Sequence, residues 1–119
     1  MADRVRAEAR GHRGEAWALW LLRLKGHRIL GRRIKTHAGE IDLVTLSPMG
    51  PVCFVEVKAR SLARDAVEAV TEEQRTRIAR AASLYLAARP GLARRGARFD
   101  IVTVAGMPRH FPDAWRMEG

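Results

Sequence analysis

The sequence predicts an α/β fold in which helices flank a mixed central sheet. Two segments in the middle of the chain, residues 40–46 and 52–60, are rich in apolar and β-branched residues, as buried strands are. Helix-like apolar patterns precede and follow them, and a further strand-like segment covers residues 98–104. This alternation predicts the order α-β-β-β-α-β within one domain over residues 1–119, a length sufficient for a single hydrophobic core.

The first expected element is a helix from about Arg4 to Lys25, regular from about Arg13, with residues 1–10 flexible or frayed. Its apolar residues lie on nearly all sides, so we expect the sheet or a partner to cover most of it. Gly26 follows as a typical stop signal. Such a helix permits a homodimer interface without requiring one.

Three strands are expected in close succession after this helix. They cover residues 27–36, 40–46 and 52–60, with a turn at 38–39 and a Pro- and Gly-containing loop at 47–51. The short connections predict that the three strands form an antiparallel meander.

A second helix is expected from Thr71 to about Arg89. Its first residues match a capping box, in which Thr71 and Gln74 each satisfy a backbone N–H of the other. The fourth strand, over residues 98–104, comes next, and residues 107–119 are expected to form an irregular tail.

The composition restricts the class of protein and its partners. With 47% hydrophobic and 29% charged residues, the chain is expected to be globular. It shows no secretory signal pattern and no apolar run of membrane-spanning length, and its single cysteine fits a reducing cytoplasm. We therefore expect a cytoplasmic protein with no membrane partner. A net charge of +9 attracts polyanions, so the expected partner is a nucleic acid.

Charged residues alternate within the two central strands. Glu40 and Asp42 share one strand face, and Glu56 and Lys58 share another. Ionised groups in an apolar strand cost several kcal/mol unless they are paired or bind a metal. A local ion pair accounts for Glu56 and Lys58, but not for their position among apolar residues beside Asp42. The pattern indicates two carboxylates holding Mg²⁺ and a lysine that orients water or stabilises charge, a set suited to phosphodiester hydrolysis.

Three further polar residues have two interpretations each. Glu15 lies on the helix stripe of Leu19 and Leu22, so it either converges on the metal site or only favours the helix dipole. Glu40 lies next to a turn and is either an accessory residue or solvated. Gln74 either faces the same site or only serves the capping box.

Basic residues cluster around the acidic segments. Isolated clusters of this kind are usually solvated surface, but together they indicate a rim that contacts phosphates without reading base sequence. The candidate nucleic-acid-binding residues are Arg32, Arg33, Lys35, Arg60, Arg64, Arg75 and Arg77.

Four segments resemble the YraN family of small bacterial proteins, which is similar to archaeal Holliday junction resolvases in the PD-(D/E)xK nuclease superfamily. They are residues 13–15 (RGE), 39–44 (GEIDLV), 54–60 (FVEVKAR) and 98–102 (RFDIV). They occur in the order of the family, and the resemblance extends from about residue 11 to the C-terminus.

The resemblance implies a restriction-endonuclease-like fold with Mg²⁺ or Mn²⁺ as cofactor. It implies Asp42 and Glu56 as metal ligands, with the Val57 carbonyl as a third. Lys58 would be the catalytic lysine and Glu15 the helix carboxylate of the resolvase branch. Gln74 departs from the lysine expected in many relatives. Resolvase relatives act as dimers on branched DNA.

Two functions are therefore open. The first is a metal-dependent endonuclease of DNA, including branched or damaged DNA. The second is a non-catalytic nucleic-acid-binding or scaffold module that keeps the nuclease fold. In a protein that no longer catalyses a reaction, the polar residues of the active site can be replaced. All of them are present here, which favours the enzyme.

Overall fold

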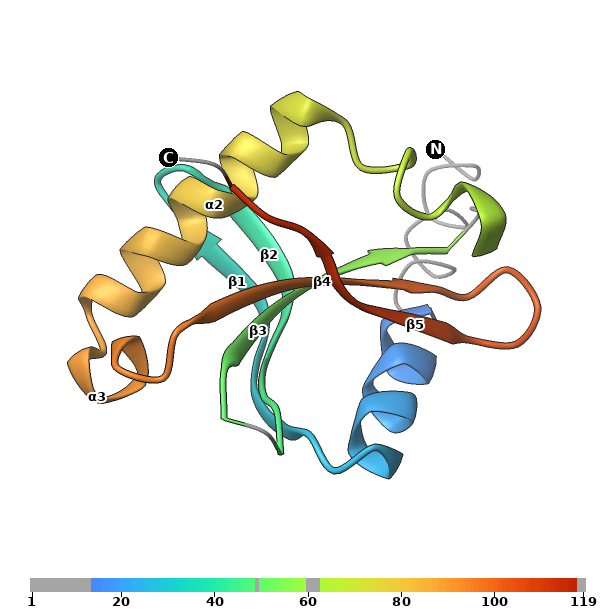
Figure 1. Ribbon diagram of the computed structural model, residues 1–119, viewed down its shortest axis with the longest axis horizontal. Helices are drawn as coiled ribbons and strands as arrows, with labels where there is room; N and C mark the ends of the chain where they lie inside the picture. Colours follow the sequence, from blue (N-terminus) through green and yellow to red (C-terminus); the bar gives the residue numbers. More distant parts are fainter. Residues whose placement is uncertain (1–13, 49, 60–62, 118–119) are drawn as a thin grey trace, which may run out of the picture.

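A computed structural model describes residues 14–48, 50–59 and 63–117 of the chain, arranged around a five-stranded mixed sheet (Figure 1). The strand order in the sheet is β1-β2-β3-β4-β5. β3 and β4 are parallel, and all other neighbours are antiparallel. The strands are β1 (Arg28–Thr36), β2 (Gly39–Leu46), β3 (Val52–Lys58), β4 (Ala97–Thr103) and β5 (Arg109–Trp115). The predicted α/β class and the order α-β-β-β-α-β are confirmed, with β5 added at the end.

Helices cover the two faces of the sheet, and Figure 1 shows the two long ones on opposite sides. The N-terminal helix, described over residues 14–24, packs Ala18 and Leu22 against Val55 and Val102. On the other face, α2 (Glu72–Ala87) packs against a second apolar cluster that contains Phe54. The short elements η1 (Ala63–Asp65) and α3 (Pro90–Ala93) lie in the connection from β3 to β4. No helix within the described ranges is long and apolar enough to span a membrane.

The N-terminal helix is less covered than its sequence predicts. Ala18 and Leu22 are fully buried, whereas Trp17, Trp20 and Leu24 are 61%, 59% and 83% exposed. One sheet face can bury only one stripe of a helix, and the part of the chain that the structure describes places no second layer on the other stripe. The flexible segment expected over residues 1–10 lies outside the described residues.

The prediction of an irregular tail over residues 107–119 is wrong, because β5 occupies much of it. Pro112 and Asp113 interrupt the usual strand pattern, and Asp113 has a φ of 52°. Proline is tolerated here because β5 lies at the edge of the sheet. The strand is held by long-range contacts, including the stacked rings of Trp115 and Phe99, whose centroids are 5.2 Å apart.

Candidate active site

Asp42 lies where the pairing between β2 and β3 ends. Backbone pairing runs from Leu46 opposite Val52 to Leu43 opposite Val55. Beyond it, the backbone N–H of Val57 donates to Oδ2 of Asp42 at 2.8 Å. A side-chain carboxylate thus takes the role of a backbone acceptor, which fixes Asp42 against β3.

Glu56 and Lys58 follow the strand alternation onto the sheet face that α2 covers. Phe54, two residues earlier, meets Tyr85 of α2 edge to face, with ring centroids 5.8 Å apart. The Lys58 Nζ lies 3.7 Å from Oε1 of Glu56, and the two side chains are 20% and 17% exposed. The predicted i, i+2 pair therefore exists, and it lies largely out of solvent.

Burial, together with neighbouring negative charge, raises the pKa of both central carboxyls. Burial is the largest cause, and it raises the pKa of Asp42 to about 6 and that of Glu56 to about 7. The charge of Glu15 raises the pKa of Asp42 further, and the charge of Asp42 raises that of Glu56. The Val57 N–H and Lys58 only partly compensate. Carboxylates held together at such a cost are typical of a site that binds a cation.

The N-terminal helix brings Glu15 close enough to Asp42 for its charge to raise the pKa of Asp42. Oε2 of Glu15 accepts a hydrogen bond from Nε of Arg33 at 2.8 Å, and the side chain is 12% exposed. The preceding residue, Gly14, lies tightly against the sheet: a Cβ there would come within 2.9 Å of Val104 Cγ2 and 3.3 Å of Ala59 Cβ. The close approach that glycine allows places the start of this helix beside the ends of β3 and β4.

Glu15, Asp42, Glu56 and Lys58 are called the acid cluster below. Among the residues that the structure describes, no group of three or more His, Cys, Asp or Glu side chains is placed to hold a metal ion. Mg²⁺ commonly uses only one or two protein carboxylates and completes its shell with water and phosphate oxygens. Asp42 and Glu56 are two carboxylates of this kind; that they share a metal, with the carbonyl of Val57 as third ligand, stays a prediction.

The two accessory candidates lie in different surroundings. Glu40 is exposed on the β1–β2 hairpin, and its charge contributes to the raised pKa of Asp42. Oε1 of Gln74 accepts from the Thr71 N–H at 3.0 Å, and the Gln74 N–H donates to Thr71 Oγ1 at 3.2 Å. Gln74 therefore serves the capping box. The α2 residue whose charge acts on Glu56 is Arg77, one turn further along the helix.

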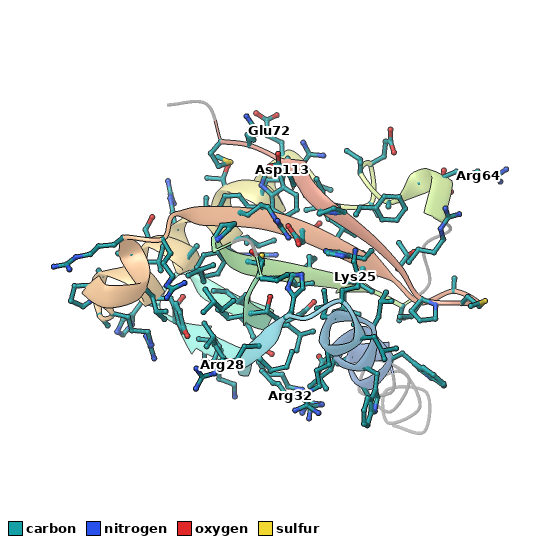
Figure 2. The ribbon with its side chains drawn as sticks, turned by 60° about the horizontal axis from the view of Figure 1, so that its bottom comes forward. Lys25, Arg28, Arg32, Arg64, Glu72 and Asp113 are labelled. Carbon is teal, nitrogen blue, oxygen red and sulfur yellow. The ribbon has the colours of Figure 1, made fainter. Side chains whose placement is uncertain are left out.

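The basic candidates on β1 divide into exposed and engaged residues. Arg32 and Lys35 are exposed, and Figure 2 shows the Arg32 side chain directed away from the ribbon. Arg33 is bound to Glu15. Only the exposed pair is available for an external phosphate.

The remaining basic candidates also differ in their exposure and in their partners. Arg64 is exposed and lies 3.9 Å from Asp65, while Arg60 lies outside the described residues. Arg75 donates to the carbonyl oxygens of Val70 and Val67 at 3.1 and 2.8 Å. These bonds tie the loop before α2 to the helix, so Arg75 has a structural role that its sequence context did not reveal.

Sequence reasoning also missed a buried polar network around Asp100. This fully buried carboxylate accepts two hydrogen bonds from Arg98 at 2.9 Å, one from His110 at 2.7 Å and one from the Asp113 N–H at 3.0 Å. Burial alone would raise the pKa of Asp100, but these hydrogen bonds lower it to about 2. The network ties β5 to β4. The alternation of Arg98 and Asp100 is the signal that could have indicated it.

Comparison with known proteins places the chain in a family. The model of the uncharacterised protein family UPF0102 matches residues 14–104. A UPF0102 protein of Paramagnetospirillum magneticum is 48% identical over 118 residues, covering 94% of this chain and 91% of the relative. One from Agrobacterium fabrum is 45% identical, covering 94% and 93%. With a family model over most of its length and relatives of this similarity, the chain belongs to the UPF0102 family.

Proposed function

We propose that this protein is a metal-dependent nuclease that hydrolyses phosphodiester bonds in DNA. The observation that carries the proposal is the placement of Asp42 beside β3, where the Val57 N–H donates to it at 2.8 Å, next to the largely buried Glu56. Burial raises the pKa of both carboxyls, and the charge of Asp42 raises that of Glu56 further. Such a pair destabilises the folded protein at neutral pH unless a cation joins it. A lysine ammonium 3.7 Å from one of the two carboxylates completes the set.

The residues of the acid cluster have separable roles in this reaction. Asp42 and Glu56 would hold Mg²⁺ or Mn²⁺, which lowers the pKa of bound water and polarises a phosphoryl oxygen. Lys58 donates its N–H groups to the water or to the phosphate oxygen on which negative charge develops. Glu15, held by Arg33, adds negative charge beside Asp42 and so favours cation binding.

The surroundings of the acid cluster support a polyanionic substrate. The chain has a net charge of +9, and Arg32 and Lys35 are exposed on β1, the strand next to β2. Positive charge of this kind draws nucleic acid to the protein and offsets the repulsion between phosphates and the acid cluster.

The direct test is cleavage of labelled duplex, single-stranded and branched DNA in Mg²⁺ or Mn²⁺. We expect Glu56→Gln and Lys58→Ala each to reduce the rate at least 100-fold, because each removes a group that contacts the metal or the reacting phosphate. Glu68→Gln, which neutralises an exposed carboxylate outside the acid cluster, is the control and should keep the wild-type rate. Activity that persists in the Glu56→Gln/Lys58→Ala double variant would exclude these roles.

One observation favours the alternative of a non-catalytic nucleic-acid-binding module. Within the described ranges, the side chains do not form a complete metal cage. A calorimetric Mn²⁺ titration separates the two functions. The nuclease predicts binding that Asp42→Asn abolishes, whereas the module predicts salt-sensitive DNA binding without metal uptake.

A further inference from the structure

A cavity lies between the β1–β2 turn and α2, and its lining is basic. It has a volume of about 470 Å³ and is lined by His37, Ala38, Glu73, Thr76, Arg77 and Arg80. We call it the turn cavity. A volume of this size can accept a phosphate group together with bridging water.

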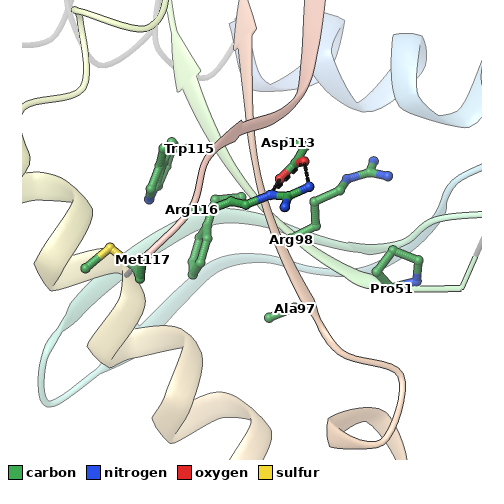
Figure 3. Close-up of a pocket in the computed structure, with 8 residues that line it drawn as sticks. Pro51, Ala97, Arg98, Asp113, Trp115, Arg116 and Met117 are labelled. Carbon is green, nitrogen blue, oxygen red and sulfur yellow. Dashed lines mark hydrogen bonds and ion pairs between the residues drawn. The ribbon is translucent and has the colours of Figure 1, made fainter. Parts of the chain in front are cut away.

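The arginines of the turn cavity differ from those of the cavity shown in Figure 3. There, Arg98 is bound to Asp100, and Arg116 donates to Asp113 at 2.7 Å. In contrast, the ion pairs found between described residues include neither Arg77 nor Arg80. Of the two cavities, the turn cavity is therefore the one whose arginines are not engaged in an ion pair with another described residue.

Arg77 connects the turn cavity to the acid cluster. Its aliphatic stem lies against Gly39 at the hairpin, where a Cβ would come within 2.9 Å of Arg77 Cγ and 3.0 Å of Cδ. Gly39 has a φ of 143°, which also disfavours other residues at this position. The charge of Arg77 acts on Glu56 from this position. The turn cavity also lies at the hairpin end of β2, the strand that carries Asp42, so an anion bound there would lie on the hairpin side of the acid cluster.

We propose that the turn cavity binds a backbone phosphate of the nucleic acid strand, next to the phosphate that the acid cluster cleaves. This inference rests on the proposed function and adds a substrate-positioning site to it. Two planar guanidinium groups match phosphate oxygens and fix a strand in register without reading its bases. Arg77 and Arg80 are the residues that bind this phosphate.

Glu73 offers a test in which binding should become stronger. It lines the same cavity, and its negative charge opposes an anion there. Neutralising Glu73 should therefore strengthen binding of nucleic acid. A variant that is merely destabilised or misfolded does not bind more tightly, so this gain separates a phosphate site from a structural role.

The experiment measures binding of a fluorescent single-stranded DNA by anisotropy over a range of salt concentrations, without divalent metal. We expect Arg80→Gln to weaken binding about tenfold and to lower the salt slope by about 0.7, as for one lost phosphate contact. Glu73→Gln should tighten binding about threefold by removing an unfavourable charge at a phosphate contact. The control Arg95→Gln removes an equal charge from an exposed position that follows α3, outside the cavity, and should change affinity less than twofold.

Any of three results would overturn the inference. The first is equal loss in Arg80→Gln and Arg95→Gln, and the second is no gain in Glu73→Gln; both include the case that the wild type binds no DNA. The third is displacement of the DNA by millimolar inorganic phosphate, which would assign the cavity to a free phosphate. Because these measurements exclude metal, they are independent of the cleavage assay. If the wild type does not cleave DNA but the variants change DNA affinity as expected, the nuclease proposal is refuted and the phosphate site is still supported.

Discussion

The carboxylate of Asp42 accepts the backbone N–H of Val57, so an acidic side chain on β2 is fixed one residue away from Glu56 on β3. This bond sets the position of Asp42 independently of any metal. It also separates two properties of Asp42, hydrogen-bond acceptance and negative charge, which substitutions can remove one at a time.

Asp42→Asn should therefore raise the stability of the metal-free protein. Asparagine keeps an oxygen that accepts from Val57, but it removes the charge that raises the pKa of Glu56. We expect a gain of about 1 kcal/mol at pH 8 in chemical denaturation. Asp42→Ala, the matched comparison, leaves the Val57 N–H without this acceptor and should lose about 1–3 kcal/mol. Equal destabilisation by both variants would show that the negative charge of Asp42 does not lower the stability of the metal-free protein.

Stabilisation by divalent metal should increase with pH. The pKa values of Asp42 and Glu56 in the folded protein, about 6 and about 7, lie above their ordinary values of 3.8 and 4.5. Because their pKa values are raised, these two carboxyls bind more protons in the folded state than in the unfolded state. Their contribution to the free energy of unfolding therefore falls as pH rises from about 4 through about 7. Mn²⁺ competes with those protons. Its effect on the melting temperature should be small at pH 5.5 and at least 3 °C at pH 8. An equal shift at both pH values would contradict these assignments.

Gly14→Ala should impair both folding and the acid cluster. The added Cβ would lie 2.9 Å from Cγ2 of Val104, a stiff β-branched side chain. We expect a loss of about 1–3 kcal/mol in chemical denaturation and a lower cleavage rate, because the helix that carries Glu15 must shift. Gly91→Ala is the control, since a Cβ there meets no atom within 4 Å. Equal stability of the two variants would show that the helix start is not tightly packed.

His27 should make the protein sensitive to mild acid. Burial is the main cause that lowers the pKa of His27 from 6.5 to about 4, with the charge of His110 contributing. A histidine whose pKa is lowered in the folded state supplies stability above its unfolded value of 6.5, and this stability is lost as pH falls toward 4. Between pH 7 and pH 4.5, the free energy of unfolding of His27→Gln should therefore fall by about 2 kcal/mol less than that of the wild type. The acid cluster has the opposite pH dependence, but it is common to both proteins and cancels in this comparison. An unchanged pH dependence would exclude His27 as the cause.

Much of the fold could be predicted from local sequence because its main signals are local. The alternation of charged and apolar residues in the two central strands identified Asp42, Glu56 and Lys58 as neighbours, and the capping box correctly located the start of α2. In contrast, β5 was not predicted, because it is held by contacts with residues on β4 that its own sequence does not reveal. Trp115 stacks on Phe99, and His110 and the Asp113 N–H donate to Asp100.

The role of Gln74 could not be decided from the sequence, although the buried side of α2 follows the predicted helical spacing of Ile78, Ala82 and Tyr85. Gln74 lies four residues before the buried Ile78, yet its side chain accepts from the Thr71 N–H, and the α2 residue whose charge acts on Glu56 is Arg77. The exposed Trp17 and Trp20 show a similar limit, because an apolar helix does not reveal how many layers will cover it.

The most direct test of the account is a crystal soaked in Mn²⁺ and measured at a wavelength where manganese scatters anomalously. We expect one peak within about 2.5 Å of a carboxylate oxygen of Asp42 and of a carboxylate oxygen of Glu56. A peak bound to only one of the two, or none at a pH above 8, would contradict the claim that these two side chains share a metal ion.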